Sequence, residues 1–75
     1  MDRDELLEMR RRYREGSVGR IQIDLALEMI GTRFRARDLE WEVNRTHQDG
    51  FLAWRTDGLG WDWFSVEEIE AERAQ

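Results

Sequence analysis

The side chains that most often carry out chemistry in enzymes are sparse in this chain. His47 is the only histidine, cysteine is absent, and the two serines, Ser17 and Ser65, stand where helices are expected to start. A zinc site needs three or four nitrogen or sulfur ligands, and a nucleophilic serine needs a histidine beside its hydroxyl. The sequence therefore predicts neither a metal site nor a serine hydrolase, and we interpret His47 as an exposed loop residue.

The carboxylates and glycines do not form a catalytic or phosphate-binding pattern either. Glu40 and Glu42 alternate outward on one expected strand, and a domain of 75 residues leaves little room for the cleft that acid–base catalysis needs. The segment 57–62 lacks the calcium-loop pattern with its terminal glutamate. Gly58 and Gly60 make neither a P-loop nor a dinucleotide fingerprint. We therefore expect a protein that is not an enzyme and binds no cofactor.

The most informative group of residues is aromatic. Trp54, Trp61, Trp63 and Phe64 surround one expected hairpin, and strand alternation places Trp61 and Trp63 on one face and Asp62 and Phe64 on the other. Apolar side chains thus occur on both faces, whereas a small sheet covered by helices on one side needs them on one face only. The excess predicts an exposed interface, unless the helices and a barrel interior absorb every ring.

We expect this hairpin to bind the partner. The predicted binding residues are three tryptophans and the charged residues beside them, namely Trp54, Trp61, Trp63, Arg55, Asp57 and Asp62. Tryptophan and arginine are enriched at binding hot spots. A protein partner is expected first, nucleic acid is the second choice, and a homodimer seam is a further use of such a patch.

Composition limits the class of protein. The 75 residues allow one domain, 1–75, and all twelve basic residues are arginine. The net charge of −5 is concentrated after residue 37, which disfavours broad binding to nucleic acid and suits a basic protein partner. The lack of cysteine, of an apolar signal core and of a membrane-length apolar stretch predicts a cytoplasmic protein without a membrane partner.

Residues 1–30 are expected to form a helical region. Residues 2–15 predict a helix with Asp2 as N-cap, Glu5 completing a capping box and Gly16 as the stop. Residues 17–30 fit two patterns, because their apolar residues alternate as in a strand and also line a helical face. That helical face would comprise Val18, Ile21, Leu25 and Met29. The Leu-Ala-Leu-Glu-Met segment and the caps at Ser17 and Gly31 favour the helix, which we choose.

Residues 31–65 are expected to form an antiparallel β-meander, followed by a helix over 66–74. The predicted strands are Arg33–Ala36, Glu40–Arg45, Phe51–Thr56 and Trp61–Phe64, joined by a loop over 46–50 and a turn over 57–60. Ser65 and Glu68 predict a capping box at the start of the last helix. The predicted fold class is therefore α+β, with a helical region, a four-stranded meander and a short C-terminal helix.

Two fold resemblances follow from these segments. The Gly31-Thr32-Arg33-Phe34 opening, Trp41-Glu42-Val43, the two Asp-Gly turns and the closing 64–69 segment resemble a small SH3-like barrel or roll. That resemblance implies a binding domain for peptides, proteins or nucleic acids. Alternatively, residues 34–43 as a helix and 51–64 as a wing resemble a winged helix-turn-helix, in which Asp38, Glu40 and Glu42 would face a phosphate-rich groove.

Three functions remain in view. The first is a non-catalytic protein-binding module, such as the accessory or inhibitor proteins that phages and mobile elements encode. The second is a nucleic-acid-binding regulator that uses Arg33, Arg35, Arg37, Arg45 and Arg55 beside the tryptophans. The third is a small structural subunit that forms a homo-oligomer. A salt titration against DNA separates the second from the first, because phosphate contacts weaken steeply with salt.

Overall fold

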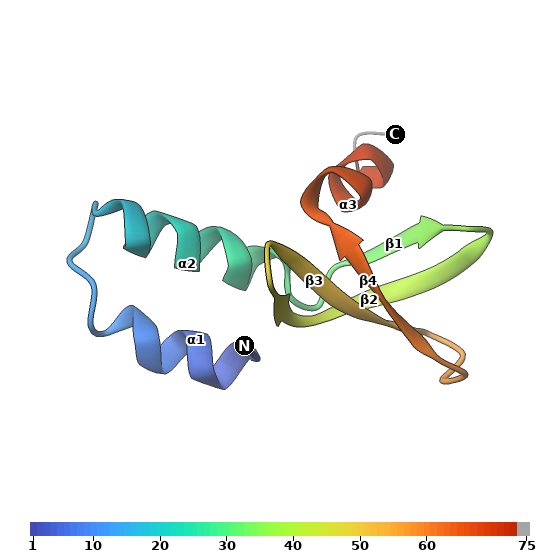
Figure 1. The fold of residues 1–75 in the computed structure, drawn as a ribbon, viewed down its shortest axis with the longest axis horizontal. Helices are drawn as coiled ribbons and strands as arrows, with labels where there is room; N and C mark the ends of the chain where they lie inside the picture. The colour runs from blue at the N-terminus through green and yellow to red at the C-terminus, as the bar shows by residue number, and fades with distance from the viewer. Residues whose placement is uncertain (74–75) are drawn as a thin grey trace.

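A computed structural model describes residues 1–73 of the chain (Figure 1). The elements follow in the order α1 (Arg3–Arg10), α2 (Val18–Met29), β1 (Arg33–Ala36), β2 (Leu39–His47), β3 (Gly50–Arg55), β4 (Trp61–Ser65) and α3 (Val66–Arg73). The predicted α+β class, the N-terminal helical region, the four-stranded meander and the short C-terminal helix are confirmed. The expected last residue of the C-terminal helix, Ala74, lies outside the described residues. No helix within residues 1–73 combines the length and the apolar character that crossing a membrane requires.

Helix α1 begins at the expected cap but ends earlier than expected. Asp2 and Glu5 form the capping box, with the Glu5 N–H donating to Asp2 Oδ1 at 2.9 Å. The predicted helix over 2–15 is wrong in its second half, because α1 ends at Arg10. Arg20 from α2 explains the early end: its Nη1 donates to the carbonyl oxygens of Arg10 and Tyr13, at 3.3 Å and 3.1 Å. Carbonyls at a helix end need such donors.

The segment 17–30 is helical, as chosen from the sequence. The Arg20 N–H donates to Ser17 Oγ at 3.2 Å at the start of α2, and Gly31 follows the helix with φ of 90°. Only glycine adopts this left-handed conformation without a steric penalty. The alternative interpretation of 17–30 as a strand is therefore wrong.

The buried face of α2 differs from the one expected. Ile23 and Met29 are buried, whereas Val18, Ile21 and Leu25 are exposed. Two polar contacts with α1 set this orientation: Asp24 accepts from Arg10 Nε at 2.6 Å, and Arg20 caps α1. The side of α2 that carries Arg20 and Asp24 is therefore turned toward α1, and the side that carries Val18, Ile21 and Leu25 is turned outward.

The four strands form one antiparallel sheet in the order β1-β2-β3-β4. Residues Arg37 and Asp38 form the two-residue turn between β1 and β2, with φ of 55° and 62°. Two positive φ values are typical of the turns whose twist matches antiparallel strands. Strand β2 runs on to His47, so the predicted loop over 46–50 shrinks to a turn at Gln48 and Asp49. The winged helix-turn-helix interpretation is wrong, because residues 34–43 are strand, turn and strand.

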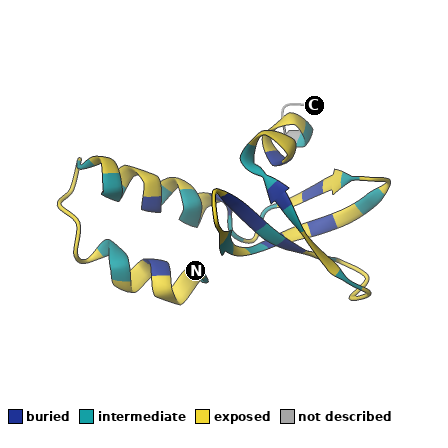
Figure 2. Cartoon of the chain, viewed as in Figure 1, coloured by how far each residue is buried: buried dark blue, intermediate teal, exposed yellow. Residues whose placement is uncertain are grey.

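The core lies on one face of the sheet, beneath α3 and the end of α2. It consists of Met29, Phe34, Trp41, Val43, Phe51, Ala53, Phe64 and Ile69. Figure 2 shows that this buried set lies mostly in the strands, while the α1–α2 hairpin is largely exposed. Phe64 anchors the core, since its ring makes edge contacts with Phe34 at 4.9 Å and Trp41 at 4.8 Å between centroids.

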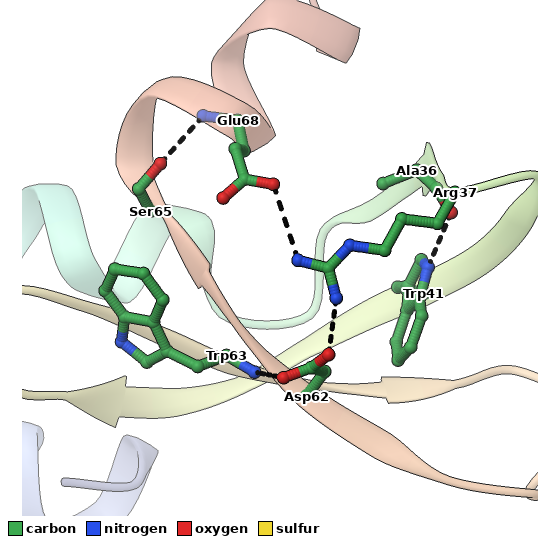
Figure 3. Close-up of polar contacts among 7 residues, drawn as sticks. All are labelled: Ala36, Arg37, Trp41, Asp62, Trp63, Ser65 and Glu68. Atoms are coloured by element: carbon green, nitrogen blue, oxygen red, sulfur yellow. Dashed lines mark hydrogen bonds and ion pairs between the residues drawn. The ribbon is translucent and has the colours of Figure 1, made fainter.

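Helix α3 begins with half of the capping box that the sequence predicts. The Glu68 N–H donates to Ser65 Oγ at 3.2 Å. The Glu68 carboxylate does not complete the box within the described residues; its Oε2 lies 3.6 Å from Arg37 Nη2 (Figure 3). Glu68 therefore connects α3 to the β1–β2 turn.

Candidate functional site

The face of the sheet opposite the core carries a row of residues from all four strands. Strand pairing places Arg33 beside Glu42, Glu42 beside Trp54, and Trp54 beside Trp61. A second row places Arg45 beside Leu52 and Leu52 beside Trp63. We call this surface the outer face. It contains Arg33, Arg35, Glu40, Glu42, Arg45, Leu52, Trp54, Trp61 and Trp63.

Trp54 and Trp61 form an exposed aromatic pair at the β4 edge of the outer face. Their relative exposures are 43% and 58%, and their ring centroids lie 5.8 Å apart at an interplanar angle of 63°. Edge-to-face contact of two indoles is favourable, but it leaves their remaining surfaces in water. Large apolar rings exposed together on a sheet are a candidate contact surface for another molecule.

Trp63, although it points to the same face, is fixed by the protein itself. Its indole N–H donates to the His47 carbonyl oxygen at 3.0 Å, and its ring is half-buried. A Cβ at Gly50 would lie 2.5 Å from this ring, so the indole packs directly on the glycine backbone. Trp63 therefore borders the exposed pair and holds the β2–β3 turn.

The charged residues of the outer face are partly paired among themselves. Arg33 Nε lies 3.3 Å from Glu42 Oε1, and Arg33 Nη1 lies 3.9 Å from Glu40 Oε1. Arg35 and Arg45 have no carboxylate partner within the described part of the chain. The outer face thus offers an indole pair with two arginines available to a ligand.

Arg55 and Asp57, predicted to bind the partner, pair with each other: Arg55 is the last residue of β3, and Asp57 lies in the turn that follows. Arg55 Nη2 is 2.6 Å from Asp57 Oδ2, and Asp57 Oδ1 accepts from the Leu59 N–H at 2.9 Å. The Leu59 N–H, and then the Arg55 guanidinium, hold the pKa of the Asp57 carboxyl below its ordinary value. This pair shapes the β3–β4 turn and does not join the tryptophans.

Asp62 also lies away from the tryptophans, on the opposite face of β4. One carboxylate oxygen pairs with Arg37, and the other accepts from the Trp63 N–H at 2.7 Å (Figure 3). Of the six predicted residues, the structure therefore brings together Trp54, Trp61 and Trp63 on one surface and places the three charged residues elsewhere.

Sequence reasoning did not pair the tryptophans with their cross-strand neighbours on the outer face. Glu42 becomes the partner of Trp54, and Leu52 the partner of Trp63, only through the cross-strand register. For β2 and β3, the signal that could have found the register is the two-residue turn at Gln48 and Asp49, because turn length fixes the register of a hairpin. Alternation predicts which residues share a face within one strand, but not which residues of neighbouring strands lie side by side.

The described residues offer no arrangement for metal binding. No group of three or more histidine, aspartate or glutamate side chains that could hold a metal ion occurs in residues 1–73. His47 lies at the exposed end of β2, where its carbonyl oxygen, not its ring, holds Trp63. No family model, curated protein or solved structure to which the chain was compared gives a match.

Proposed function

We propose that this chain is a small non-catalytic module that binds another protein through its outer face. The observation that carries the proposal is the exposed Trp54–Trp61 pair, which no helix covers because Ile69 of α3 packs on the core side. Tryptophan is enriched at binding hot spots, and the side chains that border a hot spot keep water away from it. Leu52 and Trp63, both half-buried, border the pair on the outer face.

The outer face is better suited to contact by side chains than by strand addition at β4. An exposed edge strand recruits a partner strand through its free backbone N–H groups. The Asp62 carboxylate already accepts from the Trp63 N–H at 2.7 Å in the middle of β4. A partner is therefore expected to seat apolar side chains on the indoles and carboxylates beside Arg35 and Arg45.

The test is a double variant, Trp54→Ala/Trp61→Ala, compared with Leu59→Ala. Leu59 is 76% exposed in the β3–β4 turn. Leu59→Ala therefore removes exposed apolar surface away from the outer face and is the control. Both variants should fold, because the indole pair contributes only about 0.5–1.5 kcal/mol beyond its burial. Each is used for affinity capture from cells that carry the gene naturally, with and without nuclease, and the captured protein is then titrated in purified form.

The proposal expects the double variant to lose the partner and Leu59→Ala to keep it. Loss of hot-spot tryptophans costs about 2 kcal/mol or more, which is about thirtyfold in Kd. Equal capture by wild type and the folded double variant would show that the indoles are not the interface.

A second candidate, a single-stranded nucleic acid, is favoured by one observation. Arg35 and Arg45 share the outer face with the indoles and have no carboxylate partners in the described residues. Base stacking on aromatic rings is worth about 1–3 kcal/mol per base. Against this, Arg37 and Arg55 pair elsewhere, and Glu40 and Glu42 occupy the same face. Quenching of tryptophan fluorescence by a labelled oligonucleotide, with affinity falling steeply as salt rises, would favour this candidate instead.

A further inference from the structure

A second surface lies between the helical hairpin and the rest of the fold. A groove of about 650 Å³ runs between α1, α2, the β2–β3 turn and α3. Its floor is apolar and is formed by Leu6, Met9, Ile23, Met29, Phe51 and Val66. The groove is separate from the outer face, because Phe51 and Met29 belong to the core side of the sheet.

The charges around the groove are all of one sign. Three acids, Glu28, Asp49 and Glu70, line it, one each from α2, the β2–β3 turn and α3. None of the eleven arginines that precede Arg73 lines it. The arginines of the hairpin are directed elsewhere, since Arg10 pairs with Asp24 and Arg20 caps α1. A ligand that enters this groove therefore meets an apolar floor and an acidic rim.

The apolar surface continues from the groove along α2. Leu25 lines the groove at 55% exposure, and Ile21 and Val18 extend its stripe at 50% and 72% exposure. The spacing of these three residues, three and four apart, keeps them on one side of the helix. An occupant that covers both the groove and this stripe must be elongated, which disfavours a small compact ligand.

We propose that this groove binds an amphipathic helix of another protein, with apolar side chains on one face and arginine or lysine along its borders. Grooves with apolar floors bind such helices through residues spaced three and four apart. The acidic rim selects cationic flanks and repels phosphate, so nucleic acid is not the occupant.

The groove is built before the partner arrives. Arg10 Nε contacts Asp24 Oδ1 at 2.6 Å, which joins α1 to α2. The Thr46 N–H donates to the Met1 carbonyl oxygen at 2.8 Å, which joins the start of α1 to β2. A groove whose walls are already fixed loses less conformational entropy on binding.

The test uses a model peptide and does not rest on the proposed function of the outer face. The probe is a fluorescent Leu/Arg peptide of about 18 residues with leucines spaced three and four apart, long enough to form a helix. Its control has the same composition with leucine and arginine alternating, and a third peptide replaces arginine with glutamate. Binding is followed by fluorescence anisotropy at low and moderate salt.

Two matched charge-reversal variants locate the site. Glu28→Arg/Glu70→Arg changes the groove rim, and Glu15→Arg/Glu67→Arg changes two exposed acids outside it by the same net charge. All four positions are exposed, so both variants should keep the far-UV circular dichroism of the wild type. Leu25→Ala, a half-exposed position in the groove, tests the apolar contact independently.

The proposal expects saturable binding of the helical Leu/Arg peptide, weakened at least tenfold by the rim variant and less than twofold by its control. Leu25→Ala should weaken binding severalfold, and the NMR methyl signals of Met9 and Met29 should shift while the indole N–H signals of Trp54 and Trp61 do not. The proposal is overturned by equal loss in the two charge variants, by equal binding of the alternating peptide, by shifts confined to the indoles, or by no saturable binding. Failure here leaves the outer face untouched, because its test uses other residues and another ligand.

Discussion

Arg37 at the β1–β2 turn reaches across the core face of the sheet and pairs with Asp62 on β4 (Figure 3). The same guanidinium lies 4.3 Å from the centre of the Phe64 ring and 3.6 Å from Glu68 Oε2. The two edge strands of the sheet are thus connected over the core by one side chain. Arg37 is also in the left-handed region, with φ of 55°, which is unfavourable for an L-residue with a Cβ.

The two properties of Arg37 can be separated by substitution. Arg37→Ala and Arg37→Gly both remove the ion pairs, which are half-exposed and worth about 0.2–1 kcal/mol. Only glycine adopts the left-handed backbone conformation of this turn without the steric cost of a Cβ, so we expect Arg37→Gly to be more stable than Arg37→Ala by about 1 kcal/mol in urea denaturation.

Arg35 supplies the control for that comparison. It lies in β1 with an ordinary strand conformation, where glycine is less favourable than alanine. Arg35→Gly should therefore be less stable than Arg35→Ala. The same order at both positions would contradict the conformation described for the turn.

Gly50 is the glycine whose replacement is expected to be most harmful. An added Cβ would lie 2.5 Å from the Phe64 carbonyl oxygen and 2.5 Å from the Trp63 ring. Overpacking of this kind costs about 1–3 kcal/mol. We expect Gly50→Ala to lower the free energy of unfolding by that amount and to change the Trp63 contribution to the fluorescence spectrum.

Gly60→Ala is the matched control for Gly50→Ala. Its added Cβ would meet only Arg55 Cδ, at an ordinary contact distance of 3.6 Å. Its free energy of unfolding in urea denaturation should stay within about 0.5 kcal/mol of wild type, as for most surface substitutions. Equal effects at the two glycines would mean that Trp63 does not rest on Gly50.

The strands were predictable from sequence because their pattern depends on short-range alternation. Arg33–Ala36 was predicted with its observed bounds. The helical face of α2 was not predictable in the same way. Apolar residues surround α2, so periodicity does not select one side, and the choice is made by Arg10 and Arg20 contacts across the hairpin.

The candidate site was also predictable only where it depends on alternation within one strand. Alternation correctly put Trp61 and Trp63 on one face of β4, since it depends on the strand alone. Trp54 joins that face through its pairing with Trp61, which the sequence did not give. Which of them remain exposed depends on distant partners, such as the His47 carbonyl for Trp63. Alternation also put Asp62 on the opposite face of β4, where it lies. The three charged residues were grouped with the tryptophans as binding residues because they are adjacent in sequence, whereas Arg55 and Asp57 pair with each other.

Asp57 predicts a pH dependence of stability. Its pKa is lowered in the folded protein, first by the Leu59 N–H and then by Arg55. A carboxyl with a lowered folded-state pKa stabilises the fold fully above its ordinary pKa, near 3.9, and loses that contribution as pH falls through the folded-state pKa. The difference in unfolding free energy between wild type and Asp57→Asn should therefore be constant near neutral pH and shrink in acid. A difference that stays constant down to pH about 2 would show that the carboxylate is not stabilised by these contacts.

The outward stripe of α2 gives the last prediction. Val18 and Ile21 are exposed, and glutamine is a better helix former than valine or isoleucine. Val18→Gln/Ile21→Gln should therefore be at least as stable as wild type. Ile23→Ala, at a buried position of the same helix, should lose about 2–5 kcal/mol.

Thermal and urea unfolding of the α2 variants decide between the two faces. If the face expected from periodicity alone were the buried one, the glutamine variant would unfold and Ile23→Ala would be tolerated. The structure predicts the reverse order because Asp24 and Arg20 turn their side of α2 toward α1. The same measurement shows whether Val18 and Ile21 are available to a ligand, since a residue that can be made polar without loss of stability is not needed by the core.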